Sequence, residues 1–303
     1  MKRRIGVAGA GAWGQALAHV ARSAGQGVTV WSRAHPDLTV LSRCDAIILA
    51  VPAQAVRDVL TKLRGIVAGG QPIIISAKGI EQATGFFMNE VVADIAPQAR
   101  GMVLSGPSFA TDVMKGLPTA VVLAASTLAE AGEWGAALAL PSFRVYGSDD
   151  VLGVEIGGAL KNVLAIACGI ADGRGLGDSA RAALTTRGFA ELTRFGRKLG
   201  ARSETLMGLS GLGDLLLTCS SHQSRNYSFG LAIGAGKSVA EALAQSKGVV
   251  EGASTVQIAH ALATKHGIDM PIVSAVHAIV DGKAKPEDEI ARLLARPVGA
   301  EVK

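Results

Sequence analysis

The hexapeptide Gly9-Ala-Gly-Ala-Trp-Gly14 carries the clearest fold signal in this chain of 303 residues. It follows an apolar run at residues 4–8, and it opens a stretch of helix-forming residues that extends to residue 24. Residues 27–31 then have the composition of a second strand. In this strand–turn–helix–strand setting, a G-x-G-x-x-G motif predicts a dinucleotide-binding unit. We therefore expect an α/β fold that begins with a Rossmann-like parallel sheet.

Each glycine of the motif has a physical role in such a unit. Gly9 permits the tight turn, Gly11 lets the backbone approach a pyrophosphate, and Gly14 allows the helix to pack closely on the strand. The N-terminal N–H groups of the helix then face the phosphates. The alternative is a glycine-rich turn that binds no ligand.

The residues after the second strand bear on the choice of cofactor. NAD-preferring sites usually place Asp or Glu there, on the adenosine ribose, whereas this chain has Ser32, Arg33 and His35. Arg33 is able to bind a 2′-phosphate, so the sequence favours NADP over NAD; the alternative is a solvated surface arginine. Residues 32–45 are too few for both a helix and a third strand before the next clear strand. We predict a Rossmann unit that is trimmed after strand 2.

Later strands bring polar residues to the same edge of the sheet. The strand at residues 72–76 is followed by Lys78, and the strand at residues 102–105 is followed by a Gly/Ser turn that opens a helix. Ligands of open α/β sheets bind at the carboxyl ends of the strands, so Lys78 is well placed to contact substrate or cofactor. The alternation of strands and helices stops near Ser148. We predict a dinucleotide-binding domain at residues 1–148.

Residues 149–303 are expected to form a mostly α-helical domain for substrate binding and dimerisation. Residues 149–162 have an apolar surface too wide for an exposed helix, yet they include Lys161. Burial lowers the pKa of a lysine toward the range that is useful in proton transfer. The alternative is a lysine that extends from a packed helix to solvent. Three glycines of this segment indicate that other backbone packs closely against it: Gly153, Gly157 and Gly158.

The composition excludes several classes of protein. Hydrophobic residues make up 49%, aromatic residues 4%, and the net charge is +5, which fits a compact protein and gives no sign of a nucleic-acid surface. Three distant cysteines argue against a disulfide framework and a thiolate metal site, and we expect no metal. Lys2-Arg3-Arg4 before an Ala/Gly run superficially resembles a signal peptide, but the motif glycines interrupt the run. We expect no membrane insertion and a cytoplasmic location.

Together, several motifs resemble those of the bacterial-type NAD(P)-dependent glycerol-3-phosphate dehydrogenases. They occur in the family's order along most of the chain. The matching segments are Gly9-Ala-Gly-Ala-Trp-Gly14, Lys78-Gly-Ile-Glu81, Leu104-Ser-Gly-Pro-Ser-Phe-Ala110, Gly153-Val-Glu-Ile-Gly-Gly-Ala-Leu-Lys-Asn-Val163, Gly208-Leu-Ser-Gly-Leu-Gly-Asp-Leu215, Ser224-Arg-Asn226 and Val250-Glu-Gly252.

The resemblance implies a two-domain enzyme, usually a homodimer, that interconverts dihydroxyacetone phosphate and sn-glycerol 3-phosphate for glycerophospholipid synthesis. Lys161 matches the family's proton donor and acceptor, and the cofactor is NADP or NAD. The positions that match substrate-binding residues are Lys78, Gly106, Ser108, Lys161, Asp214, Ser224, Arg225 and Asn226. Beside the motif glycines, the positions that match cofactor-binding residues are Ala12, Trp13, Arg33, Lys78, Ala110, Arg225, Val249 and Glu251.

The chain departs from the family's pattern at three places. A large part of the family's segment between the second strand and the strand that ends at Val51-Pro52 is absent, which opens part of the adenosine pocket. Ala34 stands where many relatives have a second basic residue. Ser179 stands where Asn is usual.

Two other functions remain open at this point. A related β-hydroxyacid or 6-phosphogluconate-type dehydrogenase also combines a Rossmann domain, a helical domain and a catalytic lysine. The Ser224-Arg-Asn226 triplet and the loop before Asp214 speak against it. The other is a non-catalytic nucleotide-binding or sensing protein, which would bind cofactor tightly and turn over no substrate.

Overall fold

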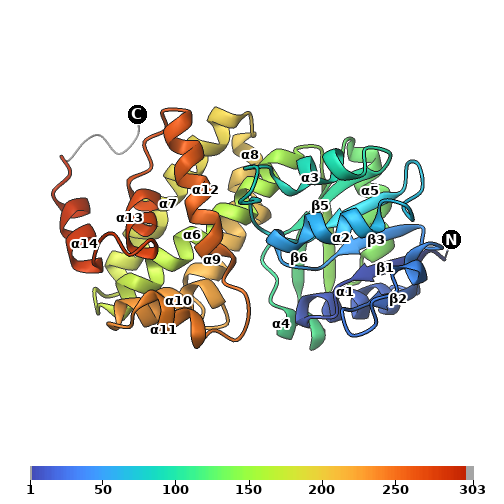
Figure 1. Cartoon of the computed structure of the whole chain (residues 1–303), viewed down its shortest axis with the longest axis horizontal. Coiled ribbons are helices and arrows are strands. Elements are labelled where there is room, and N and C mark those ends of the chain that lie inside the picture. Colours follow the sequence, from blue (N-terminus) through green and yellow to red (C-terminus); the bar gives the residue numbers. More distant parts are fainter. Residues whose placement is uncertain (1, 298–303) are drawn as a thin grey trace.

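The computed structural model describes residues 2–297, which form two halves side by side (Figure 1). The N-terminal half is a sheet with helices on both faces. The C-terminal half consists of packed helices and contributes no strand within the described residues. The predicted fold class, a Rossmann-like sheet followed by a mostly helical part, is confirmed.

One seven-stranded sheet forms the N-terminal half, in the order β2-β1-β3-β4-β5-β6-β7. Neighbouring strands are parallel except for β5 and β6, which pair antiparallel. The central strands are continuous apolar runs because helices cover both faces of the sheet. The strands are β1 (Arg4–Ala8), β2 (Gly27–Trp31), β3 (Ala46–Leu49), β4 (Pro72–Ile75), β5 (Arg100–Ser105), β6 (Thr119–Ala124) and β7 (Phe143–Ser148).

The sheet ends at β2, so the Rossmann unit is trimmed as predicted. The common Rossmann order places a third strand outside the second one, but here β2 has only β1 as a neighbour. A tight turn and the short 3-10 helix η1 (Leu38–Leu41) lead from β2 to β3. Leu38 and Leu41 are buried in the same apolar cluster as Trp31. This connection therefore packs against the end of the edge strand β2.

Helices pack on both faces of this sheet. Side chains of α1, α4 and α5 share one apolar cluster, and those of α2 and α3 share a second cluster on the opposite face. The helices are α1 (Ala12–Ser23), α2 (Val56–Leu63), α3 (Met88–Ile95), α4 (Ala110–Met114) and α5 (Leu128–Leu138), with a 3-10 turn η2 (Ala53–Ala55) before α2.

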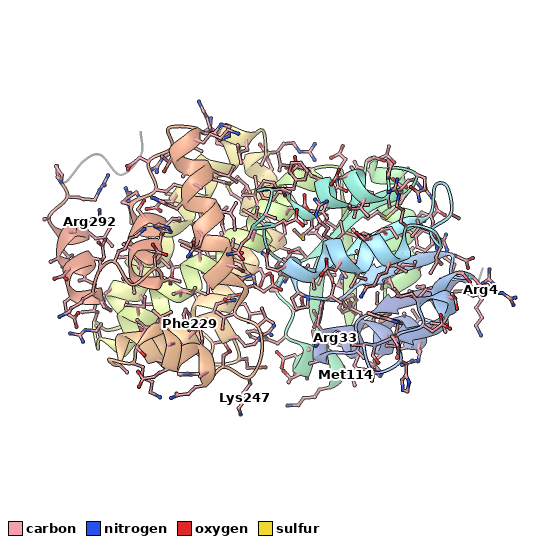
Figure 2. All side chains as sticks on the ribbon, viewed as in Figure 1. Arg4, Arg33, Met114, Phe229, Lys247 and Arg292 are labelled. Carbon is pink, nitrogen blue, oxygen red and sulfur yellow. The ribbon has the colours of Figure 1, made fainter. Side chains whose placement is uncertain are left out.

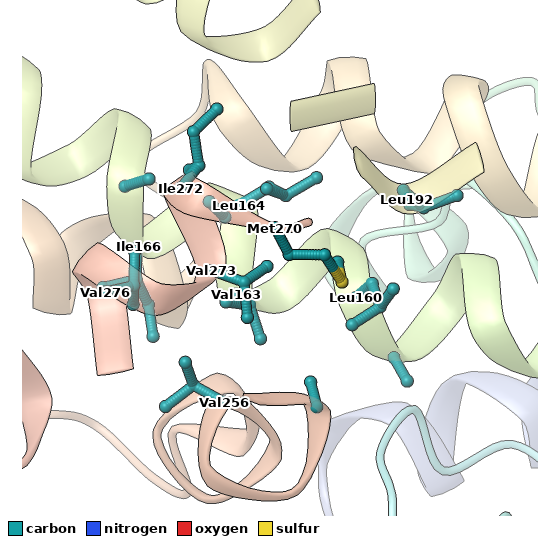
Figure 3. Close-up of a cluster of buried hydrophobic side chains, with 14 of the residues drawn as sticks. Leu160, Val163, Leu164, Ile166, Leu192, Val256, Met270, Ile272, Val273 and Val276 are labelled. Carbon is teal, nitrogen blue, oxygen red and sulfur yellow. The ribbon is translucent and has the colours of Figure 1, made fainter. Parts of the chain in front are cut away.

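The centre of the helical half is α6 (Val151–Gly173), whose side chains are buried from Gly153 to Ala171. Leu160, Val163 and Ile166 of α6 lie among apolar side chains of α12 and α13 (Figure 3). The helix is long and apolar enough to cross a membrane, but 89% of its most apolar window is buried inside the protein. It is therefore a core helix.

Within the described residues, eight further helices complete the helical half, and a short π-helical turn precedes one of them. They are α7 (Asp178–Leu199), α8 (Ser203–Met207), η3 (Leu209–Gly213), α9 (Asp214–Cys219), α10 (Arg225–Gly234), α11 (Val239–Ala244), α12 (Glu251–Lys265), α13 (Pro271–Val280) and α14 (Pro286–Leu294). Asp214, Arg225 and Asn226 stand in the first turns of α9 and α10.

Glycines let α10 cross α6 at backbone contact. A Cβ at Gly169 of α6 would overlap the carbonyl oxygen of Tyr227, and a Cβ at Gly230 of α10 would overlap that of Ile166. The same relation recurs one turn later on both helices, at Gly173 and at Gly234, so each helix carries a G-x-x-x-G pair. This crossing fixes the position of α10 relative to α6.

Glu155 joins the N-terminal part of α6 to the first turn of α3. Its Oε1 accepts a hydrogen bond of 2.8 Å from Asn89 N, and its side chain is buried between the two halves. Burial raises the pKa of this carboxyl to about 8, although backbone hydrogen bonds from Asn89 and Met88 act in the opposite direction. The folded protein therefore retains a proton that the unfolded chain releases at lower pH.

Glu155→Gln should remove a loss of stability that grows with pH. Because the folded carboxyl has the higher pKa, its stabilising contribution is complete below the ordinary value of 4.5 and is lost as the pH rises through about 8. The neutral amide has no such loss. Thermal unfolding should place the variant a few degrees above the wild type near pH 8.5, since about 1 kcal/mol shifts Tm by about 2–4 °C at this size.

Near pH 5, the Tm of the Glu155→Gln variant should equal that of the wild type or lie below it. Glu204→Gln, at an exposed position of α8, is the matched control and should follow the wild-type curve at both pH values. An equal change in Tm at both pH values would contradict a proton held on Glu155.

Candidate active site

Lys161 lies buried in the middle of α6, with only 7% of its surface exposed. Its Nζ donates hydrogen bonds to Asp214 Oδ1 at 2.7 Å and to Thr218 Oγ1 at 2.8 Å. Thr218 Oγ1 in turn donates to Asp214 Oδ1 at 3.1 Å, one turn earlier on α9. The ammonium does not extend to solvent, so the alternative of a lysine that leaves a packed helix is excluded.

Asp214 is shared between two lysines from the two halves of the molecule. Its second oxygen, Oδ2, lies 2.6 Å from Nζ of Lys78, which follows β4 at the carboxyl edge of the sheet. Lys78 Nζ also donates to the carbonyl oxygen of Gly106, after β5, at 3.0 Å. The carboxyl ends of β4 and β5 thus meet α6 and α9 at one carboxylate.

Burial and the ion pair between Asp214 and Lys161 shift the pKa values of these two groups in opposite directions. Burial disfavours ionisation of Asp214, but Lys161 and Lys78 outweigh it and hold the pKa of the carboxyl below its usual range. Burial lowers the pKa of Lys161 to about 8, with Asp214 acting to raise it and Lys78 to lower it further. An amine with this pKa exchanges protons near neutral pH, which suits general acid–base work.

The glycines before Lys161 let α6 approach these strand ends and η3. A Cβ at Gly158 would come within 2.8 Å of Ser105 Oγ at the end of β5, and one at Gly157 would come within 2.6 Å of the carbonyl oxygen of Ser210. Larger residues would push the helix away from Lys78 and Asp214. The close backbone contact expected from the sequence is present.

A buried amide network surrounds the cluster. Asn162 Nδ2 donates to the carbonyl oxygen of Lys78 at 3.0 Å, and Asn226 Nδ2 donates to Asn162 Oδ1 at 2.9 Å. Asn226 Oδ1 then accepts from Gly252 N at 2.8 Å, at the start of α12. The network therefore fixes the neighbours of both Lys161 and Arg225.

Arg225 is the first residue of α10, and its side chain is exposed beside the cluster. Ser224 caps the helix by accepting a hydrogen bond of 3.2 Å from Tyr227 N. Gly248, with a φ of +140°, lies close enough that a Cβ there would come within 2.9 Å of Arg225 Nη1. Within residues 2–297 the Arg225 side chain forms no ion pair, so its guanidinium is available to an anion.

The glycine turn at residues 9–14, which we call the phosphate turn after the role that its motif predicts, has the geometry expected for that motif. Gly9 has a φ of +126°, and a Cβ there would overlap the carbonyl oxygen of Ala50. A Cβ at Gly14 would overlap the carbonyl oxygen of Gly9, whereas one at Gly11 would meet no atom within 4 Å. Gly11 and Ala12 are exposed at the N-terminus of α1. The turn is tight on its inner side and open where a pyrophosphate would approach.

The remaining cofactor positions lie along the same edge. Trp13 and Ala110 are half-buried in the first turns of α1 and α4, and Val249 is 46% exposed. Glu251 reaches from α12 to the other half, where it accepts from Ala53 N at 3.2 Å. Burial raises the pKa of Glu251 to about 7. Arg33 lies in the turn after β2, on the N-terminal half (Figure 2).

Two family models match the chain. The one described as the C-terminus of NAD-dependent glycerol-3-phosphate dehydrogenase covers residues 150–291, and the one described as its N-terminus covers residues 33–131. The glycerol-3-phosphate dehydrogenase, NAD(P)+ type, of Parvibaculum lavamentivorans is 50% identical over 99% of this chain and 98% of its own length. The chain belongs to the NAD-dependent glycerol-3-phosphate dehydrogenase family.

Other members of the glycerol-3-phosphate dehydrogenase family agree with this assignment. The Methylobacterium radiotolerans relative is 52% identical over 98% of each chain. The crystal structure of the Coxiella burnetii glycerol-3-phosphate dehydrogenase superposes with a TM-score of 0.92 at 39% identity, over 97% of this chain and 99% of that one. The resemblance seen in the sequence is confirmed.

This member of the glycerol-3-phosphate dehydrogenase family is shorter than its relatives. Its alignment with the Parvibaculum protein spans 327 positions, whereas this chain has 303 residues, so at least 24 positions have no counterpart in this chain. The absence of a strand outside β2 agrees with the shortened connection at residues 32–45 that the sequence predicts.

The structure brings one group of predicted positions together and leaves others apart in this family member. Lys78, Gly106, Lys161 and Asp214 are in contact, and Arg225 and Asn226 border them. Arg33 and the phosphate turn line a separate stretch of the sheet edge. Two contacting residues were missed, Asn162 and Thr218. Asn162 adjoins Lys161 and Thr218 lies four residues after Asp214, which puts it on the same helix face.

Proposed function

We propose that this protein interconverts dihydroxyacetone phosphate and sn-glycerol 3-phosphate with NADPH or NADH, and so supplies sn-glycerol 3-phosphate for phospholipid synthesis. The observation that carries the proposal is the cluster of Lys161, Asp214 and Lys78 where the helical half meets the carboxyl ends of β4 and β5. Residues 1–148 then serve as the dinucleotide-binding domain and residues 149–303 as the substrate domain.

Lys161 is the proton donor and acceptor in this proposal. A bound nicotinamide dinucleotide supplies or accepts the hydride at C2 of the substrate. In the reducing direction the Lys161 ammonium polarises the C2 carbonyl and gives its proton to the oxygen as the alkoxide forms. In the oxidising direction the neutral amine takes the proton of the C2 hydroxyl. Asp214 and Thr218 hold Nζ in place for both.

The residues present fit a dinucleotide. The open face of Gly11 and the N–H groups of Ala12 and Trp13 would hold the pyrophosphate at the start of α1. The family resemblance assigns Val249, Glu251 and Ala110 to the cofactor, together with Lys78 and Arg225. Gly106, Ser108 and Ser224 complete the substrate positions, with Ser108 Oγ donating to the carbonyl oxygen of Gly106 at 2.9 Å.

Arg225→Ala should raise KM for dihydroxyacetone phosphate about 10- to 150-fold, because charge-assisted hydrogen bonds contribute about 1.5–3 kcal/mol. The guanidinium is exposed beside the cluster and offers two parallel N–H donors to a phosphate. Steady-state kinetics should show a smaller change in kcat and in the Kd of NADPH. Arg225→Lys should recover only part of the loss.

The unphosphorylated substrate dihydroxyacetone provides the control for Arg225. Its kcat/KM should be low in the wild type and unchanged by Arg225→Ala, since it carries no phosphate. An equal loss for both substrates would assign Arg225 to the carbonyl end and contradict a phosphate anchor.

The proposed function is tested by initial rates of NADPH and NADH oxidation with dihydroxyacetone phosphate, 6-phosphogluconate and a β-hydroxyacid series. Turnover confined to dihydroxyacetone phosphate and sn-glycerol 3-phosphate supports it. Turnover of a hydroxyacid would assign the chain to a sister dehydrogenase activity. Cofactor binding without turnover of any substrate would indicate a sensing protein.

We also propose a cytoplasmic homodimer. The cysteines Cys44, Cys168 and Cys219 are all unpaired and buried, which suits a reducing compartment. The dimer follows from the family resemblance, and light scattering coupled to gel filtration would measure its mass.

A further inference from the structure

The segment that carries Lys78 is tied to α2 by an ion pair. Arg57 donates from Nε to Glu81 Oε1 at 2.8 Å and from Nη2 to Glu81 Oε2 at 2.9 Å. Two parallel hydrogen bonds of this kind give an arginine–carboxylate pair both strength and a fixed geometry. Glu81 is 5% exposed, so salt screens the pair little. Arg57 holds the pKa of Glu81 below its usual range although burial acts to raise it, so the carboxylate stays charged.

Glu81 also closes the turn that follows it. Thr84 Oγ1 donates to Glu81 Oε2 at 2.6 Å. Glu81 N donates to the carbonyl oxygen of Phe86 at 2.9 Å, and Gly85 N donates to that of Glu81 at 2.9 Å. These residues therefore form a compact turn, and the carboxylate that α2 binds is its fixed point.

The backbone between Lys78 and this turn passes between η2, α6 and α12. The carbonyl oxygen of Lys78 accepts a hydrogen bond of 3.0 Å from an amide of α6. Gln54 Nε2 of η2 donates to the carbonyl oxygen of Ile80 at 2.8 Å. A Cβ at Gly79 would come within 2.9 Å of Glu251 Oε2 on α12. The position of the Lys78 backbone is thus set by contacts on several sides, and the ion pair with α2 completes them.

We propose that Arg57 is a positioning residue for the reaction, which acts through Glu81 to place the Lys78 ammonium in the active site. Lys78 Nζ lies 2.6 Å from Asp214 Oδ2, so a small displacement of its backbone separates the two charges. The inference rests on the proposed function, because it assigns Arg57 to the same reaction.

The charges around Lys161 make such a displacement measurable. The titratable groups whose charges act on Lys161 are Asp214, Cys219, Lys78 and Glu251. Burial is the main cause that lowers the pKa of Lys161, and Lys78 lowers it further. If Arg57→Met lets Lys78 withdraw, kcat/KM for the reduction should begin to decline at a higher pH than in the wild type. A loss of stability alone would lower Tm and leave this pH unchanged.

Steady-state rates of dihydroxyacetone phosphate reduction over a pH series test this role. Arg57→Met should lower kcat/KM about 10- to 100-fold, since a displacement of about 1 Å in an active site can cost about 10²-fold. Arg57→Lys keeps the charge without the two parallel bonds and should recover part of the loss. Glu81→Gln leaves Arg57 its contact with Asp94, at 2.5 Å, and should shift the pH dependence in the same direction. Combining Arg57→Met with Glu81→Gln removes both charges of the pair and should cost less than the product of the two single losses.

Hydrogen exchange measured by mass spectrometry needs no substrate. Residues 79–86 should exchange faster in Arg57→Met than in the wild type, because the turn opens more often. Lys62→Ala is the matched control, since it removes an exposed cation of the same helix, and it should change neither exchange nor pH dependence. Unchanged exchange of residues 79–86 in Arg57→Met would overturn the proposal, as would a lower Tm with the wild-type pH dependence.

The assay of the wild type keeps the two proposals separate. Wild-type turnover of dihydroxyacetone phosphate, with a pH dependence that none of the variants of Arg57 and Glu81 changes, defeats only the role of Arg57. Absence of turnover in the wild type itself defeats the proposed function, and the role of Arg57 in that reaction with it.

Discussion

Replacing Lys161 by methionine should lower kcat by about 10²–10⁴-fold, the usual contribution of a positioned general acid. Methionine retains an unbranched apolar stem of similar length, so the core around α6 should stay filled. Asp214 keeps Lys78 as its partner at 2.6 Å and is not left as an isolated buried charge. Stopped-flow measurement of NADPH oxidation at saturating substrate would report the chemical step.

The pH profile distinguishes a proton donor from a residue that only shapes the site. With a pKa of about 8, Lys161 is charged below that pH and neutral above it. Reduction needs the charged form, so its kcat/KM should fall as the pH rises through about 8, whereas oxidation should rise over the same range. The Lys161→Met variant should show neither the fall in kcat/KM for reduction nor the rise in kcat/KM for oxidation.

Lys198→Ala is the matched control for Lys161, because Lys198 is an exposed lysine on α7. It should leave both kcat and the pH profile unchanged. A Lys161→Met variant with near wild-type kcat, or with the wild-type pH dependence intact, would show that another group moves the proton.

Asp214→Asn should damage both stability and catalysis. Asp214 is 1% exposed and is the shared counter-ion of Lys161 and Lys78, so the amide leaves one buried and one half-buried ammonium group without their anion. Removing one partner of a buried ion pair costs about 3–5 kcal/mol. Thermal unfolding should therefore show Tm lower by about 10 °C. The pKa of Lys161 should fall, so kcat/KM for the reduction should begin to decline at a lower pH than in the wild type.

A double variant separates the charge from the packing. Lys161→Met combined with Asp214→Asn removes one uncompensated ammonium, so its Tm should lie above that of Asp214→Asn alone. Asp178→Asn is the control for a surface pair, since Asp178 is 89% exposed in its contact with Arg181. It should shift Tm by less than about 2 °C. Strict additivity of the two buried substitutions would contradict a shared charge cluster.

Local sequence predicted the fold better than it predicted the contacts of the site. The glycine turn, the short connection after β2 and the burial of Lys161 follow from spacing and from apolar patterns within single segments. The partners of Lys161 do not, because Asp214 and Thr218 are more than 50 residues away and meet it only when α9 packs on α6. No periodicity in either helix specifies that pairing.

Two differences have identifiable causes. Arg225 and Asn226 belong to α10 although its apolar run starts only at Tyr227, because the cap supplied by Ser224 begins the helix earlier. Asn162 went unnoticed beside Lys161, since an asparagine in an apolar helix has no local signature of what it binds. Its acceptor partner is the carbonyl oxygen of Lys78, three residues after β4, and its donor partner is Asn226 of α10.

The carboxylate of Asp214 forms ion pairs with one lysine from each half of the protein. Lys78 belongs to the sheet, whereas Lys161 and Asp214 belong to the helices, so any hinge motion that draws the halves apart stretches the contact between Lys78 and Asp214. When that contact breaks, Asp214 is left to Lys161 alone, and the repulsion that Lys78 exerts on the acid declines. Separation of the two halves would therefore raise the pKa of Lys161, whereas contact between Lys78 and Asp214 keeps Lys161 in the state that releases its proton more readily.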